Sequence, residues 1–345
     1  MSDDYRTSEK DAFLKKFGYA DYVQTPLKGD ASRRIFIRLS KSAKNYILID
    51  ANPDAGEEPT AYAAITDILR RHDLNAPEIL AADMNHGFFI VEDFGDSLFS
   101  DMLQTDLSKE EFLYQSALDA LIAVQKIPVD NDVISLSDNV TYKIHDYDVH
   151  RLICEAKLFT QWYIPYLTKR PISNVALDEF TAILVGLLTP VTNKNHVLTL
   201  RDYHAANMMY MPKHTGVKQV GLLDFQDALV GNIAYDVVSL LQDARRDVSP
   251  VLEQKMLDYY IKTANIQNPD DFKRDYVILG VQRNLKILGI FIRLWVRDKK
   301  PTYLSYMPRV WHYLETDLKD ASVRPLSDWF DRWLPLPMRH EQIAV

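Results

Sequence analysis

The sequence has little cysteine, little glycine and no long apolar run that is free of charge. Cys154 is the single cysteine among 345 residues, so no disulfide can form within the chain and no cysteine-pair zinc site exists. Glycine is scarce, with 11 residues, and the long periodic apolar stretches favour helix. The most apolar long run, residues 277–296, contains Arg283, Lys286 and Arg293, which argues against a membrane span.

The charge balance excludes another class of protein. The formal net charge of -8 gives no global basic field for nucleic acid. Residues 1–10 are polar and lack the apolar core of a signal peptide. We therefore expect a cytoplasmic protein that binds neither nucleic acid nor membranes.

The predicted secondary structure changes near residue 95 from mainly strands to mainly helices. Residues 23–95 predict strands at 33–39, 47–49 and 88–91, one helix at 60–72, and a polar connector at 92–96. After that helices dominate, and Ser108 and Glu111 have the spacing of a capping box ahead of the first of them. The expected helices are 108–126, 146–168, 176–188, 235–246, 250–265, 273–297 and 305–317. This pattern predicts two lobes, 1–94 and 95–345, with a ligand cleft at their junction.

A short motif carries the chemistry. Residues 201–207 contain R-D-x-x-x-x-N, in which Asp202 orients an attacking hydroxyl group and Asn207 binds magnesium during phosphoryl transfer. Asp224 follows a second apolar run, where a carboxylate can bridge magnesium to the phosphates. An isolated Asp and Asn in loops more often cap helices or make turns. Here two apolar strands are each followed by an aspartate, Asp202 and Asp224. Together they favour an ATP- and Mg²⁺-dependent kinase.

These residues resemble the kinase-like fold of the aminoglycoside phosphotransferase and choline kinase superfamily. Residues 29–33, 155–163, 223–241 and 282–289 also look like one branch of it, the kinases of N-acetylmuramate and N-acetylglucosamine. The resemblance implies an α+β protein-kinase-like fold, with a small antiparallel-sheet lobe that binds the nucleotide and a large helical lobe. It also implies phosphorylation of the anomeric hydroxyl group of an amino sugar. Another acceptor (an aminoglycoside, choline or an amino-acid-like metabolite) and a non-catalytic pseudokinase scaffold are the alternatives.

The small lobe departs from the broader kinase pattern. A lysine normally lies on the third strand to hold the phosphates, but here residues 47–49 are apolar and run into Asp50, which is either a site residue or a strand end. Arg33, Arg34 and Arg38 are candidates for that task, and alternation places Arg34 and Arg38 on one face. Glu57 and Glu58 receive no firm role without the lysine. Leu200 stands where a histidine is common.

The expected nucleotide contacts lie in two segments. A small-residue turn formed by Gly29, Asp30, Ala31 and Ser32 allows backbone N–H groups to approach phosphates, although any tight hairpin favours such residues. By the resemblance, Glu92, Asp93 and Phe94 fall at the hinge that binds adenine. Side-chain identity is a poor guide there, because recognition uses backbone groups.

The acceptor site is expected on the helix at 273–297. Gln282, Lys286, Arg293 and Arg297 share one face of it, with Arg283 beside them, and a basic stripe suits an anionic sugar. The alternative is the solvated face of an amphipathic helix. Substrate contacts are also expected for Asp227. The remaining expectations are sugar stacking or core packing for Phe159, Trp162, Tyr163 and Tyr166, and bracing of the site for Arg201, His204 and Asp236.

Overall fold

The structure, a computed structural model, describes residues 3–27, 34–129, 134–135, 141–194 and 196–339. The predicted turn at residues 29–32 and Arg33 lie outside these residues. The chain divides into two compact units. The sheet unit comprises Met1–Thr105, Asp130–Ile144 and Asn207–Ala228, and the helical unit comprises Asp106–Val129, His145–Ala206 and Leu229–Val345. The lobe boundary expected between residues 94 and 95 stays a prediction.

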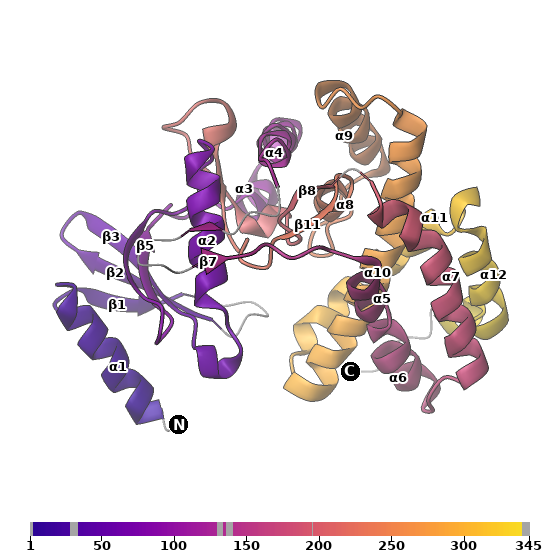
Figure 1. The fold of residues 1–345 in the computed structure, drawn as a ribbon, viewed down its shortest axis with the longest axis horizontal. Coiled ribbons are helices and arrows are strands. Elements are labelled where there is room, and N and C mark those ends of the chain that lie inside the picture. Colours follow the sequence, from indigo (N-terminus) through magenta and orange to yellow (C-terminus); the bar gives the residue numbers. More distant parts are fainter. Residues whose placement is uncertain (1–2, 28–33, 130–133, 136–140, 195, 340–345) are drawn as a thin grey trace. The chain divides into compact units, whose positions relative to one another are not determined.

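Five antiparallel strands, in the order β1-β2-β3-β5-β4, form the centre of the sheet unit (Figure 1). Side chains alternate between the two faces, so Leu48 and Ile90 share one face, whereas Ile49 and Phe89 share the other. The predicted strands correspond to β2, β3 and β5, and β4 was not predicted. The strands are β1 (Val23–Pro26), β2 (Ile35–Lys41), β3 (Lys44–Asp50), β4 (Ile79–Asp83) and β5 (Phe88–Glu92).

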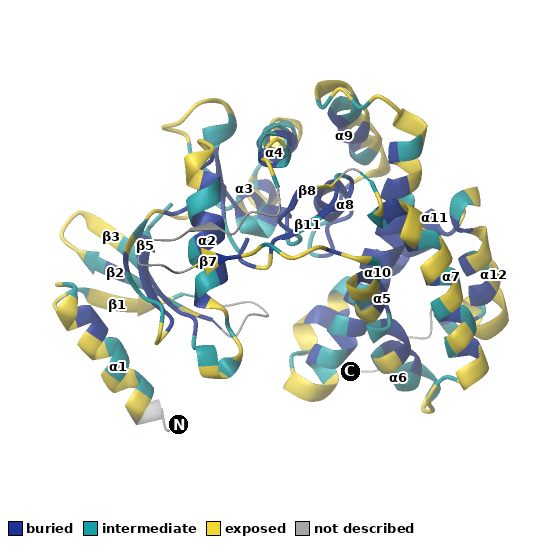
Figure 2. Ribbon diagram, viewed as in Figure 1, coloured by how far each residue is buried: buried dark blue, intermediate teal, exposed yellow. Residues whose placement is uncertain are grey.

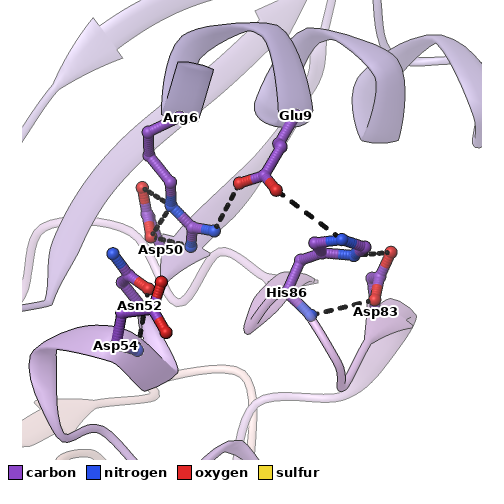
Figure 3. Close-up of polar contacts among 7 residues, drawn as sticks. All are labelled: Arg6, Glu9, Asp50, Asn52, Asp54, Asp83 and His86. Atoms are coloured by element: carbon purple, nitrogen blue, oxygen red, sulfur yellow. Dashed lines mark hydrogen bonds and ion pairs between the residues drawn. The ribbon is translucent and has the colours of Figure 1, made fainter. Parts of the chain in front are cut away.

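Helix α1 (Asp3–Lys16) covers one face of this sheet, and the sequence analysis did not predict it. Phe13 is buried in a cluster with Leu48 and Ile90, and its ring lies 5.5 Å from the ring of Phe88. A polar contact also joins α1 to the sheet, because Arg6 donates to the carboxylate of Asp50 at the end of β3 (Figure 3). The Arg6 guanidinium carbon also lies 3.8 Å from the centre of the Phe88 ring.

Helix α2 (Pro59–Arg71) covers the other face and confirms the helix predicted at 60–72. The Tyr62 ring lies 5.2 Å from Phe89 of the sheet and stacks at 5.5 Å on Phe225. Phe225 follows a hairpin of β9 (Met208–Tyr210) and β10 (Val220–Leu222). A Cβ atom on Gly221 in this hairpin would lie 2.7 Å from the ring of Phe94, so only glycine allows this close approach. The remaining elements of the unit are α3 (Phe99–Thr105) and the short pair β6 (Ile134–Ser135) and β7 (Thr141–Tyr142).

The helical unit is arranged around α10 (Pro269–Asp298), whose middle is buried (Figure 2). Helices α5 (Val149–Ala156), α8 (Tyr235–Leu241) and α11 (Met307–Asp317) pack against it. A Cβ atom on Gly289 would lie 2.3 Å from the carbonyl carbon of Leu158, so α10 meets the chain after α5 backbone to backbone. The other elements are α4 (Glu110–Gln125), α6 (Ile164–Thr168), α7 (Asn174–Thr192), α9 (Pro250–Thr263), α12 (Arg324–Trp333), α13 (Leu336–Arg339), and the paired strands β8 (His196–Thr199) and β11 (Leu229–Asn232).

Three helix predictions need correction. Ser108 is not the cap of α4, because the Asp106 side chain caps a short turn ahead of it by accepting from the Ser108 N–H group. The helix expected at 146–168 is interrupted after α5 and continues as a π-helical turn and then α6. The helix expected at 235–246 ends with α8 at Leu241. By length and composition α7 could span a membrane, although core helices of water-soluble proteins pass the same test.

Candidate active site

The loop that carries Asp202 begins where β8 ends and is anchored through its backbone. Asp236, at the start of α8, accepts from the N–H groups of Leu200 at 2.6 Å and Arg201 at 2.8 Å. The Ser239 hydroxyl donates to the Arg201 carbonyl oxygen at 3.1 Å. Arg201 has a φ of 70°, a left-handed conformation that is unfavourable for a side chain of this size. The bonds from α8 hold it there, and they are the contacts that a bracing role for Asp236 requires.

Cationic side chains set the protonation state of Asp202. Burial opposes ionisation of this carboxyl group, but the positive charges of Lys286, Arg201 and Arg283 outweigh that effect and lower its pKa to about 2. Asp202 is therefore a carboxylate at neutral pH. Such a weak base can orient a hydroxyl group by accepting its hydrogen bond, and it takes up the proton only late in the reaction.

Glu155 is a member of this group that the sequence analysis did not single out. Its carboxylate accepts from Arg201, from the Tyr147 hydroxyl group, and from Lys286 Nζ at 3.1 Å. Burial alone would raise the pKa of Glu155, but Lys286 and Arg201 lower it below its ordinary value. A weak signal was present in the sequence, because Glu155 is an acidic residue beside Leu152 and Ala156, which lie on the buried face of α5.

His204 is buried, and its Nε2 lies 3.2 Å from Nη1 of Arg245. Burial and Arg245 lower its pKa below the ordinary value, so the ring is neutral at pH 7. Next to it, the Ala205 N–H group donates to Asp243, just beyond α8. These contacts brace the loop, and they suit the expected structural role of His204 better than proton transfer.

A second polar group lies in the sheet unit around Asp224. Asn207 Nδ2 lies 3.4 Å from Asp224 Oδ2, and the Leu223 N–H group donates to the Asn207 carbonyl oxygen at 3.0 Å. Gln226 donates to Asp224 and, at 3.1 Å, to Asp227, which was expected to contact the substrate. Asp224 has a φ of 56°, so the backbone turns sharply at this carboxylate.

The chemistry of Asn207 and Asp224 fits magnesium. Together they offer an amide oxygen and a carboxylate, the hard oxygen ligands that Mg²⁺ prefers. No group of three or more His, Cys, Asp or Glu side chains that could enclose a metal occurs among the described residues. A two-ligand site suits Mg²⁺, which usually keeps water and phosphate oxygens as its other ligands.

Arg34 connects this group to the start of α2. Its guanidinium group donates to Asp224 and to Gln226, and its Nε lies 3.4 Å from Glu57 Oε2. The side chain is 8% exposed. Arg34 therefore pairs with a carboxylate near α2, that of Glu57. We expected such a carboxylate to be the partner of the third-strand lysine that this chain lacks. Arg34 was a candidate from the sequence, but its pairing with Glu57 depends on the fold.

Arg38 and Asp50 have other partners. Arg38 binds Asp93 with Nε at 2.6 Å and the Gly95 carbonyl oxygen at 3.1 Å, so it braces the connector. Asp50 shares the face of Leu48, opposite to Ile49, and binds Arg6 of α1 (Figure 3). Of the two interpretations left open for Asp50, these contacts support the strand end. Adenine binding by Glu92, Asp93 and Phe94 stays a prediction.

The helix α10 does not present the expected basic stripe. Gln282 is fully buried and donates to the Leu152 carbonyl oxygen at 2.9 Å, and Arg283 is 4% exposed and donates to Ser239. Arg297 pairs with the exposed Asp298 beside it. Two of the expected substrate contacts on this helix lie in the Asp202 group. Lys286 pairs with the Glu155 carboxylate, and Arg283 acts on Asp202 through its charge.

The aromatic residues near α5 belong mostly to the core. The Phe159 and Tyr163 rings stack at 5.0 Å, both are buried, and Trp311 lies 5.5 Å from Tyr163. Tyr163 also accepts from the Trp311 ring N–H group at 2.9 Å. For Phe159 and Tyr163, core packing is therefore the correct interpretation.

Comparison with known proteins agrees with this geometry. Three curated N-acetylmuramate/N-acetylglucosamine kinases are similar to the chain. The protein from Caulobacter vibrioides is 33% identical over 97% of this chain and 98% of its own length. The one from Pseudomonas aeruginosa is 33% identical, covering 84% and 82%, and the one from Neisseria meningitidis is 30% identical, covering 89% of each.

Solved structures confirm the predicted kinase-like fold. A choline kinase from Streptococcus pneumoniae has a TM-score of 0.62 at 11% identity, covering 90% of this chain and 99% of that chain. The GDP complex of an aminoglycoside 2'-phosphotransferase has a TM-score of 0.60 at 13% identity, covering 90% and 98%. The model of the phosphotransferase enzyme family matches residues 23–272. The chain therefore belongs to the phosphotransferase enzyme family and is an ATP-dependent kinase of a small molecule.

Proposed function

We propose that the chain transfers the γ-phosphoryl group of ATP to the anomeric hydroxyl group of N-acetylmuramate or N-acetylglucosamine. The similarity to curated kinases of these two sugars, over 97% of this chain in one case, carries the proposal. The Asp202 loop supplies chemistry that suits it. The cytoplasm, where ATP is available, is the proposed location.

In this mechanism the Asp202 carboxylate accepts a hydrogen bond from the sugar hydroxyl group and aims its oxygen at the γ-phosphorus. The new O–P bond forms as the bond to the ADP oxygen breaks, and the hydroxyl proton passes to Asp202 late in the step. Asn207 and Asp224 would hold Mg²⁺, which neutralises phosphate charge when bound. The contribution of the protein is positioning and charge neutralisation, with no covalent intermediate.

Arg34 is the proposed phosphate contact in place of the missing lysine. It is a buried cation directly before β2, and Glu57 lies at its Nε while the rest of the guanidinium group donates to Asp224 and Gln226. A guanidinium fork matches phosphate oxygens well. The segment 29–32, for which the sequence predicts a turn, and the connector at 92–94 are the other proposed nucleotide contacts.

An aminoglycoside is a less suitable acceptor. It is a polycation, whereas Lys286, Arg201 and Arg283 already surround Asp202 with positive charge. N-acetylmuramate is an anion and N-acetylglucosamine is neutral, so neither is repelled by these side chains.

The test is an acceptor panel with MgATP, followed by phosphorus NMR. We expect an acid-labile sugar phosphate with the coupling of an anomeric phosphate for one or both N-acetyl sugars. Kanamycin and choline in the same panel test the alternative acceptors. Transfer to either of these, with none to the N-acetyl sugars, would overturn the proposal.

A further inference from the structure

The charges around Asp202 alternate in sign. Glu155 binds two cations, Arg201 and Lys286, and the same two cations act on Asp202. We call Glu155, Arg201, Asp202 and Lys286 the charge quartet. Lys286 and Arg201 thus pair with the Glu155 carboxylate and also act electrostatically on Asp202, the proposed catalytic group, which directly follows Arg201 in the chain.

The quartet is held in place on several sides. The side chains of Lys286, Arg201 and Glu155 are 13%, 18% and 20% exposed, respectively. The Tyr147 hydroxyl group donates to Glu155, and the Arg201 guanidinium carbon lies 5.1 Å from the centre of the Tyr147 ring. Glu155 comes from α5 and Lys286 from α10, two helices that pack together.

Such burial is a poor source of stability. The cost of removing ionised groups from water largely offsets their attraction, so apolar side chains in the same places would serve the fold as well. The quartet therefore indicates a role in the reaction, and we infer that role from the acidic and basic groups that act electrostatically on Asp202. Besides the quartet, these groups are Arg283 of α10, His204 of the loop and Asp236 of α8.

We propose that Glu155 and Lys286 are positioning residues for Asp202, acting on the orientation and charge of its carboxylate without touching the phosphoryl group. Lys286 keeps Asp202 ionised and fixed. Glu155 draws Lys286 and Arg201 back, so that one side of Asp202 stays available to the acceptor hydroxyl group. The inference rests on the proposed role of Asp202 in transfer, and it holds for any acceptor.

Two single changes and their combination test this arrangement. In Glu155→Gln the two cations keep Asp202 as their remaining anion in the quartet and occupy its oxygens, so we expect kcat to fall about 100-fold. In the Lys286→Met variant, Asp202 is less firmly held, and we expect kcat to fall about 10-fold. The double variant should recover about 10-fold relative to Glu155→Gln, because removing Lys286 releases Asp202.

The recovery distinguishes positioning from support of the fold. A merely structural pair gives a double variant that is no better than the worse single variant, and this outcome would overturn the inference. KM for ATP should stay within about twofold in all variants, since no residue of the quartet is assigned to the nucleotide. Lys273→Met is the matched control, because Lys273 is an exposed lysine of the same helix.

Each variant is assayed in two reactions after circular dichroism confirms folding. One is transfer to the N-acetyl sugars, and the other is the slow hydrolysis of ATP without an acceptor. If the wild type hydrolyses ATP but transfers to neither sugar, the proposed acceptor is wrong, and hydrolysis still tests the quartet. A wild type that does neither overturns both proposals.

Discussion

The groups around Asp202 and Asp224 are held in different ways. The Asp202 loop is fixed through its backbone, because Asp236 accepts from two consecutive N–H groups and Ser239 donates to a carbonyl oxygen. Asp224 is bound through side chains, those of Arg34, Asn207 and Gln226. A backbone anchor tolerates little change in position, whereas side-chain partners can rearrange. We therefore expect the Asp202 group to stay in one geometry and the Arg34 group to respond to the nucleotide.

Asp202→Ala is the change with the largest expected effect. Loss of the group that orients the acceptor should lower kcat at least about 10³-fold, while ATP binding and the unfolding temperature stay near those of the wild type. Steady-state kinetics and isothermal titration with ATP measure the two effects. Asp258→Ala, at an exposed carboxylate of α9, is the control. Substantial activity in the Asp202 variant would contradict the mechanism.

Arg34→Met tests the other half of the comparison. Removing charge-assisted hydrogen bonds to phosphate should raise KM for ATP about 10- to 100-fold. Arg34→Lys should restore only part of this loss, because an ammonium group lacks the planar fork. Arg71→Met, at an exposed ion pair of α2, should behave like the wild type. An unchanged KM in the Arg34→Met enzyme would place the phosphate contact elsewhere.

The anchor of the Asp202 loop predicts a pH effect on stability. Burial raises the pKa of Asp236 to about 7, despite the opposing effect of the two N–H groups. Between pH 4 and pH 7 the folded chain therefore holds a proton that the unfolded chain releases. This contribution to the free energy of unfolding, at most about 4 kcal/mol, is fully present at low pH and is lost as the pH rises through 7.

Urea unfolding at several pH values, with the wild type and Asp236→Asn, measures this contribution. The substituted amide cannot ionise, so the difference in unfolding free energy between the two proteins should change with pH in this range. A difference that stays constant from pH 4 to pH 8 argues against the assigned protonation.

Arg6→Met is the change with the smallest expected effect. It leaves Asp50 without this partner and removes the contact over Phe88, so the unfolding free energy should fall by about 1–2 kcal/mol. Because Asp50 lies on the face of the sheet opposite to Ile49 and α2, kcat and KM should not change. A rise in KM for ATP would show that α1 influences the nucleotide site.

The residues of the candidate site that are contiguous along the chain could be named from the sequence. Asp202 and Asn207 lie in one motif with a known spacing, and Asp224 follows an apolar strand, so all three could be named beforehand. The central strands β2, β3 and β5 and helix α2 followed from their periodicity. The fold class followed from the same patterns and from the resemblance.

The missed features depend on contacts between distant residues. Glu57 approaches Arg34 only after β2 and α2 have packed, and Glu155 approaches Lys286 only after α5 and α10 have packed. Helix α1 is short of apolar residues, so its periodicity was weak, although Phe13 and Leu14 are buried. The basic stripe on α10 was a helical-wheel prediction, and the burial of Gln282 depends on neighbours that such a wheel does not include.

Gly289 limits how proteins with this arrangement can vary. It lies three residues after Lys286, about 4.5 Å along the helix axis, and a Cβ atom there would meet the backbone of Leu158 at 2.3 Å. Any larger residue would push α10 away from the segment that follows Glu155. A relative that keeps the ion pair between these two helices should therefore keep a glycine at this position, even though it touches no substrate. Substitutions should therefore be tolerated at the exposed end of α10 but not at Gly289.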